Sequence, residues 1–174
     1  MSTKLVLING LGGSGKTTCG RLLCERMDSC AYFGIDMLTT VKPFEFGEDL
    51  IKLGLRNAAG LISNFFDAGY EAVVMSSGTG CQRHVDYLLN LISLPDHVYW
   101  IWLTASKAER DKRRLARSRD GADKPEWLDY VNGVVEPYVG PVKIEGGICR
   151  EIITDVLAPD EIVERILKIV GESL

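Results

Sequence analysis

The chain has 174 residues, of which 46 % are hydrophobic and 25 % are charged, a composition typical of one globular domain spanning 1–174. Its formal net charge of −4 argues against a nucleic-acid partner, and no apolar run approaches the roughly 18 residues of a membrane span. Its five cysteines show neither CxxC spacing nor a nearby histidine partner, so they predict reduced thiols in a cytoplasmic protein and no zinc site.

Strand-like and helix-like stretches alternate along the chain. Short apolar runs predict strands at 5–8, 31–35, 73–75, 98–103 and 152–154. Helical spacing of apolar residues, or helix-start signals, predict helices at 18–23, 50–66, 85–92, 106–117, from 125 onward and at 160–170. This alternation predicts an α/β domain with a parallel sheet, in which the continuous run 98–103 is covered on both faces.

The first predicted strand runs into a glycine-rich turn that opens a helix. The sequence there fits G-x-x-x-x-G-K-[ST], the phosphate-binding loop. Glycines let such a loop wrap closely around phosphate oxygens, and the helix start adds unbonded N–H donors and the positive end of its dipole. We expect the Lys16 ammonium to reach the β- and γ-phosphates and the Thr17 hydroxyl to bind Mg²⁺. The residues expected to bind ATP are Gly10, Gly12, Gly13, Ser14, Gly15, Lys16, Thr17 and Thr18.

The same turn also satisfies the dinucleotide pattern G-x-G-x-x-G, with Asp36 about 20 residues further on, where a ribose-binding acid is found. A dinucleotide site has no use for a lysine and a hydroxyl at the helix start, whereas a triphosphate with magnesium needs both. Lys16 and Thr17 therefore favour the phosphate loop.

Asp36 follows the second predicted strand and is the best candidate for a catalytic acid. Ligands of open α/β sheets bind beyond the carboxyl ends of the strands, so Asp36 could take a proton from an acceptor hydroxyl or hold Mg²⁺ through water. The alternative is that it caps a helix beginning at Met37. The third strand ends at Ser76, where a Walker-B aspartate would often lie, and this raises the importance of Asp36.

The third strand runs into Gly78-Thr79-Gly80, whose N–H groups at a helix entrance could bind the acceptor. A plain strand-to-helix turn explains the same residues equally well. Arg83 follows closely and is a further candidate for acceptor contact, with a solvated helix position as the alternative. Arg56, in the long second helix, could grip an anionic acceptor or simply lie at the surface.

The helix predicted at 106–117 opens with a capping box, Ser106-x-x-Glu109, and precedes a polar loop at 118–124. A solvated basic face is the usual explanation for its positive charge. Because it follows the fourth strand, we expect at least one of its arginines to fold over the triphosphate as part of a lid, with Arg113 and Arg117 leading. Six basic residues fall within the ten positions 110–119, and Arg110, Arg114 and Arg117 share one helix face. The six are Arg110, Lys112, Arg113, Arg114, Arg117 and Arg119.

With these residues in place, the chain resembles small P-loop kinases of the shikimate kinase and nucleoside monophosphate kinase group. It is also similar to chloramphenicol phosphotransferase, whose second strand ends in a segment much like Phe33-Gly34-Ile35-Asp36. The resemblance implies a three-layer fold with a five-stranded parallel sheet in the order 2-3-1-4-5, and an arginine-bearing lid over about 113–125.

The same resemblance implies roles for single residues. Asp36 matches the acceptor-side aspartate, Arg56 the substrate-gripping arginine, and Arg113 and Arg117 the lid arginines, while Gly78 and Gly80 match the glycine turn after the third strand. Shikimate kinases carry a second aspartate two residues after the first, but this chain has Leu38 there, which argues against shikimate as the acceptor.

The sequence therefore predicts an ATP- and Mg²⁺-dependent phosphotransferase acting on a hydroxyl group of a small molecule. Two alternatives stay open at this point: a nucleoside or nucleotide kinase, and a nucleotide-binding regulatory module with little transferase activity. The sequence leaves the acceptor, the choice between ATP and GTP, and the oligomeric state undetermined.

Overall fold

A computed structural model describes residues 2–116 and 125–171. Its strands form one parallel sheet in the order β2-β3-β1-β4-β5. The α/β fold class and the expected strand order are thereby confirmed. The strands are β1 (Lys4–Asn9), β2 (Cys30–Gly34), β3 (Ala72–Ser76), β4 (His97–Thr104) and β5 (Ile148–Ile153).

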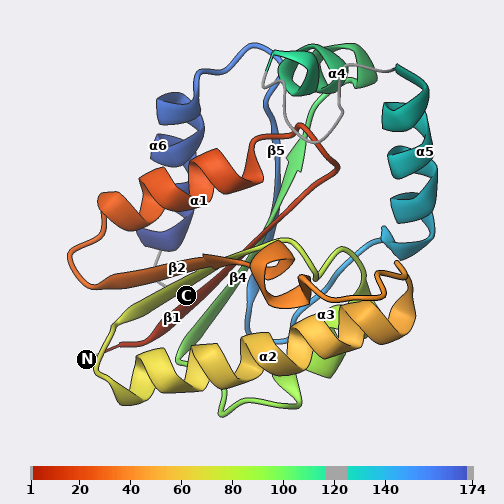
Figure 1. The fold of residues 1–174 in the computed structure, drawn as a ribbon. Coiled ribbons are helices and arrows are strands. Elements are labelled where there is room, and N and C mark those ends of the chain that lie inside the picture. Colours follow the sequence, from red (N-terminus) through yellow and green to blue (C-terminus); the bar gives the residue numbers. More distant parts are fainter. Residues whose placement is uncertain (1, 117–124, 172–174) are drawn as a thin grey trace.

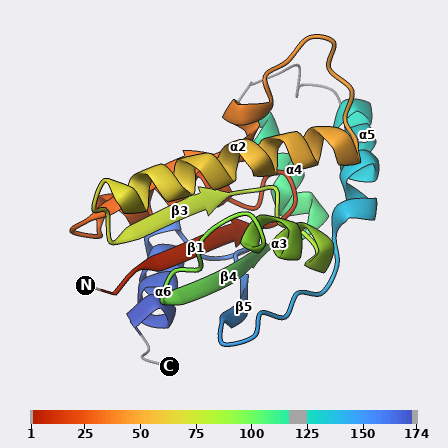
Figure 2. The same cartoon turned by 90° about the horizontal axis from the view of Figure 1, so that it is seen from below.

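Helices cover both faces of the sheet (Figure 1). One face is covered by α1 (Lys16–Glu25) and α6 (Pro159–Gly171), and the other by α2 (Glu48–Asp67) and α3 (Gln82–Leu89). Figure 2 shows α2 lying across its face of the sheet with α3 beside it. Beyond the carboxyl ends of the strands lie α4 (Lys107–Leu115), α5 (Pro125–Val135) and two short 3-10 helices, η1 (Ile35–Thr39) and η2 (Glu136–Tyr138).

The central strands are mostly apolar because helices bury both faces of the sheet there. In β1, Leu5 and Leu7 pack toward α2, while Val6 and Ile8 pack toward α1 and α6, and all four side chains are fully buried. Burying side chains of this size contributes about 1.5–3 kcal/mol each. The core thus forms two layers, one on each side of a rigid sheet whose carboxyl edge carries the loops described below.

Most element boundaries differ slightly from the sequence predictions, and three of these differences affect the description of the site. Strand β5 begins at Ile148, earlier than the predicted start at residue 152. The prediction missed its first half because this edge strand contains exposed Arg150 and Glu151, which interrupt the apolar pattern. Helix α3 ends at Leu89, before the predicted end at residue 92. Helix α4 ends at Leu115, and the expected loop 118–124, with most of the expected lid, falls outside the described residues.

The capping box predicted for α4 is only half formed. Ser106 Oγ accepts a hydrogen bond from the Glu109 N–H at 3.3 Å, as expected. The Ser106 N–H donates to the Asp155 carboxylate at 3.0 Å instead of to Glu109, which pairs with Arg113. These contacts fix the start of α4 against the segment that follows β5. Within the two described ranges, no helix is both long and apolar enough to cross a membrane.

Candidate active site

The turn after β1 has the backbone that a phosphate-binding loop requires. Gly10 has a φ of 143° and Gly13 a φ of 87°, in the region that favours glycine. A Cβ atom at Gly10 would lie 2.3 Å from the Leu103 carbonyl oxygen, and one at Gly13 would lie 2.6 Å from the Arg110 carbonyl oxygen. The turn therefore lies in close contact with both β4 and α4, and side chains at these two positions would force it outward.

The turn leads directly into the start of α1, where Gly15 is the N-cap and offers no side-chain hydrogen bond. The first turn of α1 also contains no acidic residue, so the positive end of the helix dipole faces the glycine turn uncompensated. The Lys16 ammonium donates to the Leu11 carbonyl oxygen at 3.0 Å, which places its charge over the turn. Thr17 and Thr18 follow in the first turn of α1.

Ser14 gives an independent sign that this turn accepts a ligand. Its side chain is fully buried, and its Oγ has no hydrogen-bond partner among the described residues. A buried hydroxyl without a partner costs about 1–3 kcal/mol. A phosphate oxygen held in the turn would supply the missing partner, so the residues present fit a bound polyphosphate.

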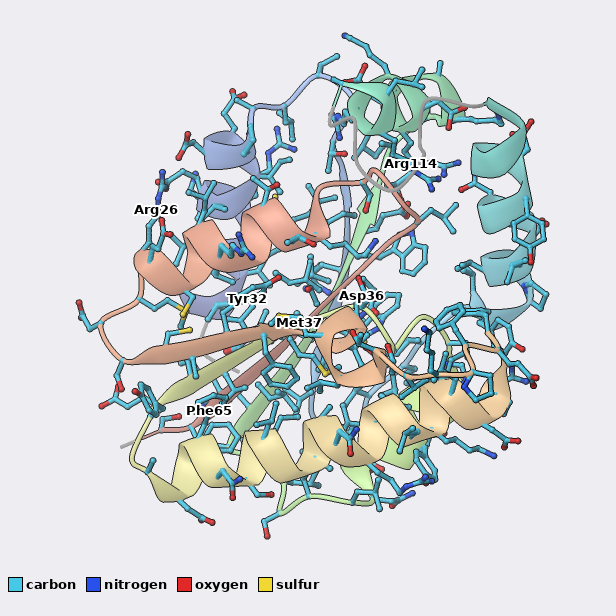
Figure 3. The ribbon with its side chains drawn as sticks, viewed as in Figure 1. Arg26, Tyr32, Asp36, Met37, Phe65 and Arg114 are labelled. Carbon is cyan, nitrogen blue, oxygen red and sulfur yellow. The ribbon has the colours of Figure 1, made fainter. Side chains whose placement is uncertain are left out.

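Arg114 lies against the glycine turn. A Cβ atom at Gly12 would lie only 3.2 Å from its Nη1 and 3.3 Å from its Cζ, so a side chain there would crowd the guanidinium. Burial lowers the pKa of Arg114, but a guanidinium stays protonated at neutral pH. Figure 3 shows Arg114 at the turn and Asp36 across from it on η1, both at the carboxyl edge of the sheet. A fixed positive charge therefore lies beside the turn.

Arg110 lies on α4 one helical turn before Arg114 and anchors this part of the helix. Its side chain is buried, with Nε donating to the Ala105 carbonyl oxygen at 3.2 Å and Nη1 donating to Asn132 Oδ1 at 3.1 Å. Lys107 also pairs with Asp129 at 2.8 Å. Helix α5 is thus docked on α4, and the face that carries Arg110 and Arg114 is turned toward the glycine turn.

Of the two arginines that the sequence ranked first, Arg113 lies away from the glycine turn. Arg113 donates through Nη1 to Thr154 Oγ1 at 3.1 Å, through Nη2 to the Thr154 carbonyl oxygen at 2.6 Å, and through Nε to Glu109 at 2.9 Å. Arg113 is therefore held at the end of β5, and Arg114 takes the place beside the turn that was expected for it. Arg117 lies outside the described residues. The helix face shared by Arg110 and Arg114 was the sequence signal for this arrangement.

Asp36 lies in η1, directly after β2, and is exposed. The alternative that it caps a helix is wrong, because the N-cap of η1 is Gly34 and no side chain provides a cap hydrogen bond there. A Cβ atom at Gly78 would lie 2.3 Å from Ile35 Cδ1, so the turn after β3 packs against the residue that precedes Asp36. The structure therefore brings Asp36 and the Gly78–Gly80 turn together.

The turn after β3 is tied to β1 by a buried pair of polar side chains. Asn9 Nδ2 donates to Thr79 Oγ1 at 2.9 Å, and the Thr79 N–H donates to Asn9 Oδ1 at 3.1 Å. Trp100 Nε1 donates to the Thr79 carbonyl oxygen at 2.8 Å. The Thr79 side chain is fully buried and its N–H is bonded to Asn9, so Thr79 holds the turn in place. Contact of the turn's N–H groups with an acceptor stays a prediction for Gly78 and Gly80. Asn9 was missed, although it is the polar end of an otherwise apolar strand.

Arg83 lies in the first turn of α3, just after the turn that follows β3, and Arg56 lies within α2. Arg83 pairs with Glu48 at 3.2 Å and lies over the Tyr138 ring at 5.4 Å. Arg56 donates to Tyr87 Oη at 3.4 Å. Arg56 also lines a groove of about 380 Å³ together with Pro43, Glu45, Asp49, Leu50 and Leu53. This groove is formed by residues of the 43–56 region alone and does not include Asp36.

The site contains no metal cage of its own. Ser76, at the end of β3, is buried and shares a hydrogen bond of 2.9 Å with Tyr32 Oη, so no carboxylate occupies the Walker-B position. Among the described residues, no three His, Cys, Asp or Glu side chains gather into a metal-binding group. This donor set fits Mg²⁺, which is commonly held by one or two protein ligands together with substrate phosphates.

Comparison with solved structures gives the fold a name. A sugar kinase from Janibacter sp. is 20 % identical, with a TM-score of 0.69 over 95 % of this chain and 93 % of its own. The chain has the P-loop kinase fold. A gluconokinase from Sinorhizobium meliloti is 16 % identical, with a TM-score of 0.67 over 98 % of each chain. The Mycobacterium tuberculosis APS kinase CysC, solved with AMPPNP and APS, is 13 % identical, with a TM-score of 0.67 over 98 % of this chain and 99 % of its own.

These likenesses concern the P-loop kinase fold alone. No protein-family model matches the sequence, and no curated protein matches it either.

Proposed function

We propose that this protein is a single kinase domain, spanning 1–174, that transfers the γ-phosphoryl group of ATP to a hydroxyl group of a small molecule. The observation that carries the proposal is the placement of three groups at one edge of the sheet. These are the glycine turn with Lys16, the Arg114 guanidinium beside it, and the Asp36 carboxylate across from it. The kinase structures that share the fold support the same conclusion.

The glycine turn and the start of α1 would hold the polyphosphate of ATP. Lys16 carries a mobile charge that can leave the Leu11 carbonyl oxygen for a phosphate oxygen, and Ser14 Oγ would gain its missing partner. Thr17 would bind Mg²⁺. For Asp36, holding Mg²⁺ through water is the alternative to the acceptor role that we propose below. When Mg²⁺ is bound together with ATP, it neutralises negative charge on the β- and γ-phosphates.

Arg114 would stabilise the charge that grows on the transferred phosphoryl group. Catalysis of this reaction depends mainly on positioning and on fixed positive charge, because the protein has little covalent chemistry to perform. Arg110, one helical turn earlier, is bonded to the Ala105 carbonyl oxygen and to Asn132 of α5, so the helix that carries Arg114 is anchored at this point. Arg113 and Arg117 stay predictions as additional lid arginines.

Asp36 would orient the acceptor hydroxyl and take its proton. A carboxylate on an exposed turn at the end of β2 can reach a molecule that lies between η1 and the glycine turn. The backbone N–H groups of Gly78 and Gly80 flank the same place and could bind a polar group of the acceptor. Arg83 and Arg56 stay predictions as acceptor contacts.

A binding screen followed by a turnover measurement tests the proposal. Hydroxyl-bearing metabolites and nucleosides are screened for an increase in melting temperature with a non-hydrolysable ATP analogue and Mg²⁺ present, because a bound ligand stabilises the folded state. Each hit is then tested for ADP release with ATP. We expect at least one compound to raise ADP release above the rate of the protein alone. If none does, the regulatory-module alternative replaces the kinase.

A further inference from the structure

Three side chains outside the proposed kinase chemistry form a chain of polar contacts at the start of α3. Cys81 Sγ lies 3.3 Å from His84 Nδ1, and His84 Nε2 lies 3.2 Å from Glu48 Oε2. We call these residues the Cys81–His84–Glu48 cluster. The sequence-based expectation that no cysteine has a histidine partner is wrong for Cys81.

The protonation of His84 follows from its two neighbours. Nε2 faces a carboxylate, which can only accept, so Nε2 carries the proton and Nδ1 presents a lone pair to Cys81 Sγ. Burial lowers the pKa of His84, although its hydrogen bond with Glu48 acts in the opposite direction. The imidazole is therefore neutral at neutral pH and can take a proton from the thiol.

The imidazole is held rigidly by its surroundings. His84 is 2 % exposed, and its ring stacks on Tyr138 of η2, with centroids 5.9 Å apart. Glu48 comes from α2 and also pairs with Arg83 at 3.2 Å and with Lys52 at 3.6 Å. Partial burial acts to raise the pKa of Glu48, but the contacts with His84, Arg83 and Lys52 hold it below its usual value. Glu48 therefore stays ionised and fixes the orientation of the ring.

The position of Cys81 in the helix is unusual for a structural residue. Cys81 is the N-cap of α3, where Ser, Thr, Asp or Asn would satisfy a helix N–H, but its side chain makes no cap hydrogen bond. The sulfur is directed to His84 instead. The thiol is half-buried at the start of α3.

We propose that Cys81 is an activated nucleophilic thiol that undergoes exchange with small disulfides, with His84 as its general base and Glu48 as the residue that positions His84. In this step the Cys81 proton moves to His84 Nδ1, and the thiolate attacks one sulfur of the disulfide. A new S–S bond forms as the old one breaks, and the departing thiolate takes the proton from His84. No net oxidant is consumed beyond the disulfide itself.

This inference does not rest on the proposed kinase activity. The cluster lies next to the turn after β3, because Cys81 directly follows Gly80. The Gly80 carbonyl oxygen accepts a hydrogen bond from the Gly140 N–H at 3.0 Å. A disulfide adduct on Cys81 would therefore form beside the turn that the proposed function assigns to the acceptor.

Dithiodipyridine provides the test, because each exchange releases a coloured thiopyridone and leaves an adduct that mass spectrometry assigns to one cysteine. The chain has five cysteines, and none of them is in a disulfide. Burial raises the pKa of Cys149 and of Cys30, so these two are slow internal references. We expect Cys81 to react first, at least about tenfold faster than Cys149. A Cys81 rate equal to or below that of Cys149 overturns the proposal.

Variants of the two supporting residues separate activation from simple exposure. In Glu48→Gln we expect the ratio of the Cys81 rate to the Cys149 rate to fall at least about threefold, and in His84→Gln at least about tenfold. Asp49→Asn, a matched change at the next residue of α2 outside the cluster, should leave the ratio unchanged. A ratio unaffected by Glu48→Gln contradicts the positioning role of Glu48.

The pH profile of the Cys81 rate provides a readout that a purely structural effect would not move. In the His84→Gln variant the Cys81 thiol has no base to take its proton, so only its thiolate form attacks and the rate should rise steeply with pH. The parent rate should depend less steeply on pH, because His84 accepts the proton. Identical profiles in the parent and in His84→Gln would contradict general-base assistance.

Discussion

At the residue scale, the site depends on which way each charged side chain of α4 points. Arg113 and Arg114 are neighbours in the sequence, but one is bound to Thr154 at the end of β5 and the other contacts the glycine turn. Successive helical residues are about 100° apart, so a basic run necessarily divides between faces. The structure assigns the two arginines different surroundings, and this assignment can be tested.

Arg114→Ala should lower kcat at least about a hundredfold, because it removes a fixed positive charge beside the transferred phosphoryl group. Arg113→Ala should instead lower the free energy of unfolding by about 1–3 kcal/mol, since it removes hydrogen bonds to Thr154 and Glu109. Steady-state kinetics and urea unfolding of both variants distinguish these effects. A larger loss of kcat in Arg113→Ala than in Arg114→Ala would restore the assignment made from the sequence.

Lys16→Ala should weaken ATP binding at least about tenfold, because it removes the ammonium that lies over the turn. Calorimetric titration with a non-hydrolysable ATP analogue and Mg²⁺ measures the change. Lys168→Ala, on α6, is the matched control and should bind as the parent does. Equal affinity in all three proteins would show that the polyphosphate binds elsewhere.

Asp36→Asn should lower turnover at least about tenfold while leaving ATP affinity nearly unchanged, because the amide cannot accept a proton from the acceptor. The measurement needs an acceptor found by the binding screen. Asp28→Asn, just beyond α1, controls for the loss of one negative charge. Unchanged turnover in Asp36→Asn would remove the catalytic role of this residue.

At the scale of elements, the carboxyl edge of the sheet is held together by side chains that link one turn to the next. Asn9 and Thr79 are 70 residues apart in the sequence and join the end of β1 to the turn after β3. Ile35 packs on Gly78 and connects that turn to η1. These contacts place the glycine turn, Asp36 and the Gly78–Gly80 turn relative to one another before any ligand arrives.

Thr79→Val should lower the free energy of unfolding by about 1–3 kcal/mol, because it leaves the buried Asn9 side chain without its hydroxyl partner. Thr79→Ser keeps the hydroxyl and should recover most of this loss. Urea unfolding of the parent and the two variants gives the comparison. If Thr79→Val and Thr79→Ser lower the free energy of unfolding equally, the hydrogen bonds between Asn9 and Thr79 do not stabilise the carboxyl edge of the sheet.

At the scale of the whole molecule, two coupled groups make stability depend on pH in the same direction. Burial lowers the pKa of His84, and contacts with His84, Arg83 and Lys52 hold the pKa of Glu48 below its usual value despite its partial burial. On acidification the unfolded chain takes up protons at both groups before the folded protein does, so the folded state loses stability as the pH falls. Both groups link α2 to α3, which cover the same face of the sheet.

Urea unfolding should therefore give a lower free energy of unfolding at about pH 5 than at about pH 7. We expect His84 to cause the part of this decrease that begins as the pH falls through the pKa of an unfolded histidine, about 6.5. In His84→Gln this part of the pH dependence should be smaller, while the part below about pH 4.5 from Glu48 and other carboxylates persists. A slope between about pH 5 and 7 that is the same in both proteins would contradict the lowered pKa of His84.

The sequence by itself determined the fold class, the phosphate-binding loop and most element positions. These features are local: an apolar run, a helical period or a glycine pattern specifies its own backbone, and parallel strands bring their carboxyl ends to one edge. Arg114 beside the glycine turn, the Asn9–Thr79 pair and the Cys81–His84–Glu48 cluster were decided only by the tertiary structure. Each of these three features depends on how a helix is rotated or on a contact between residues far apart in the chain. A short stretch of sequence specifies neither the rotation nor the contact.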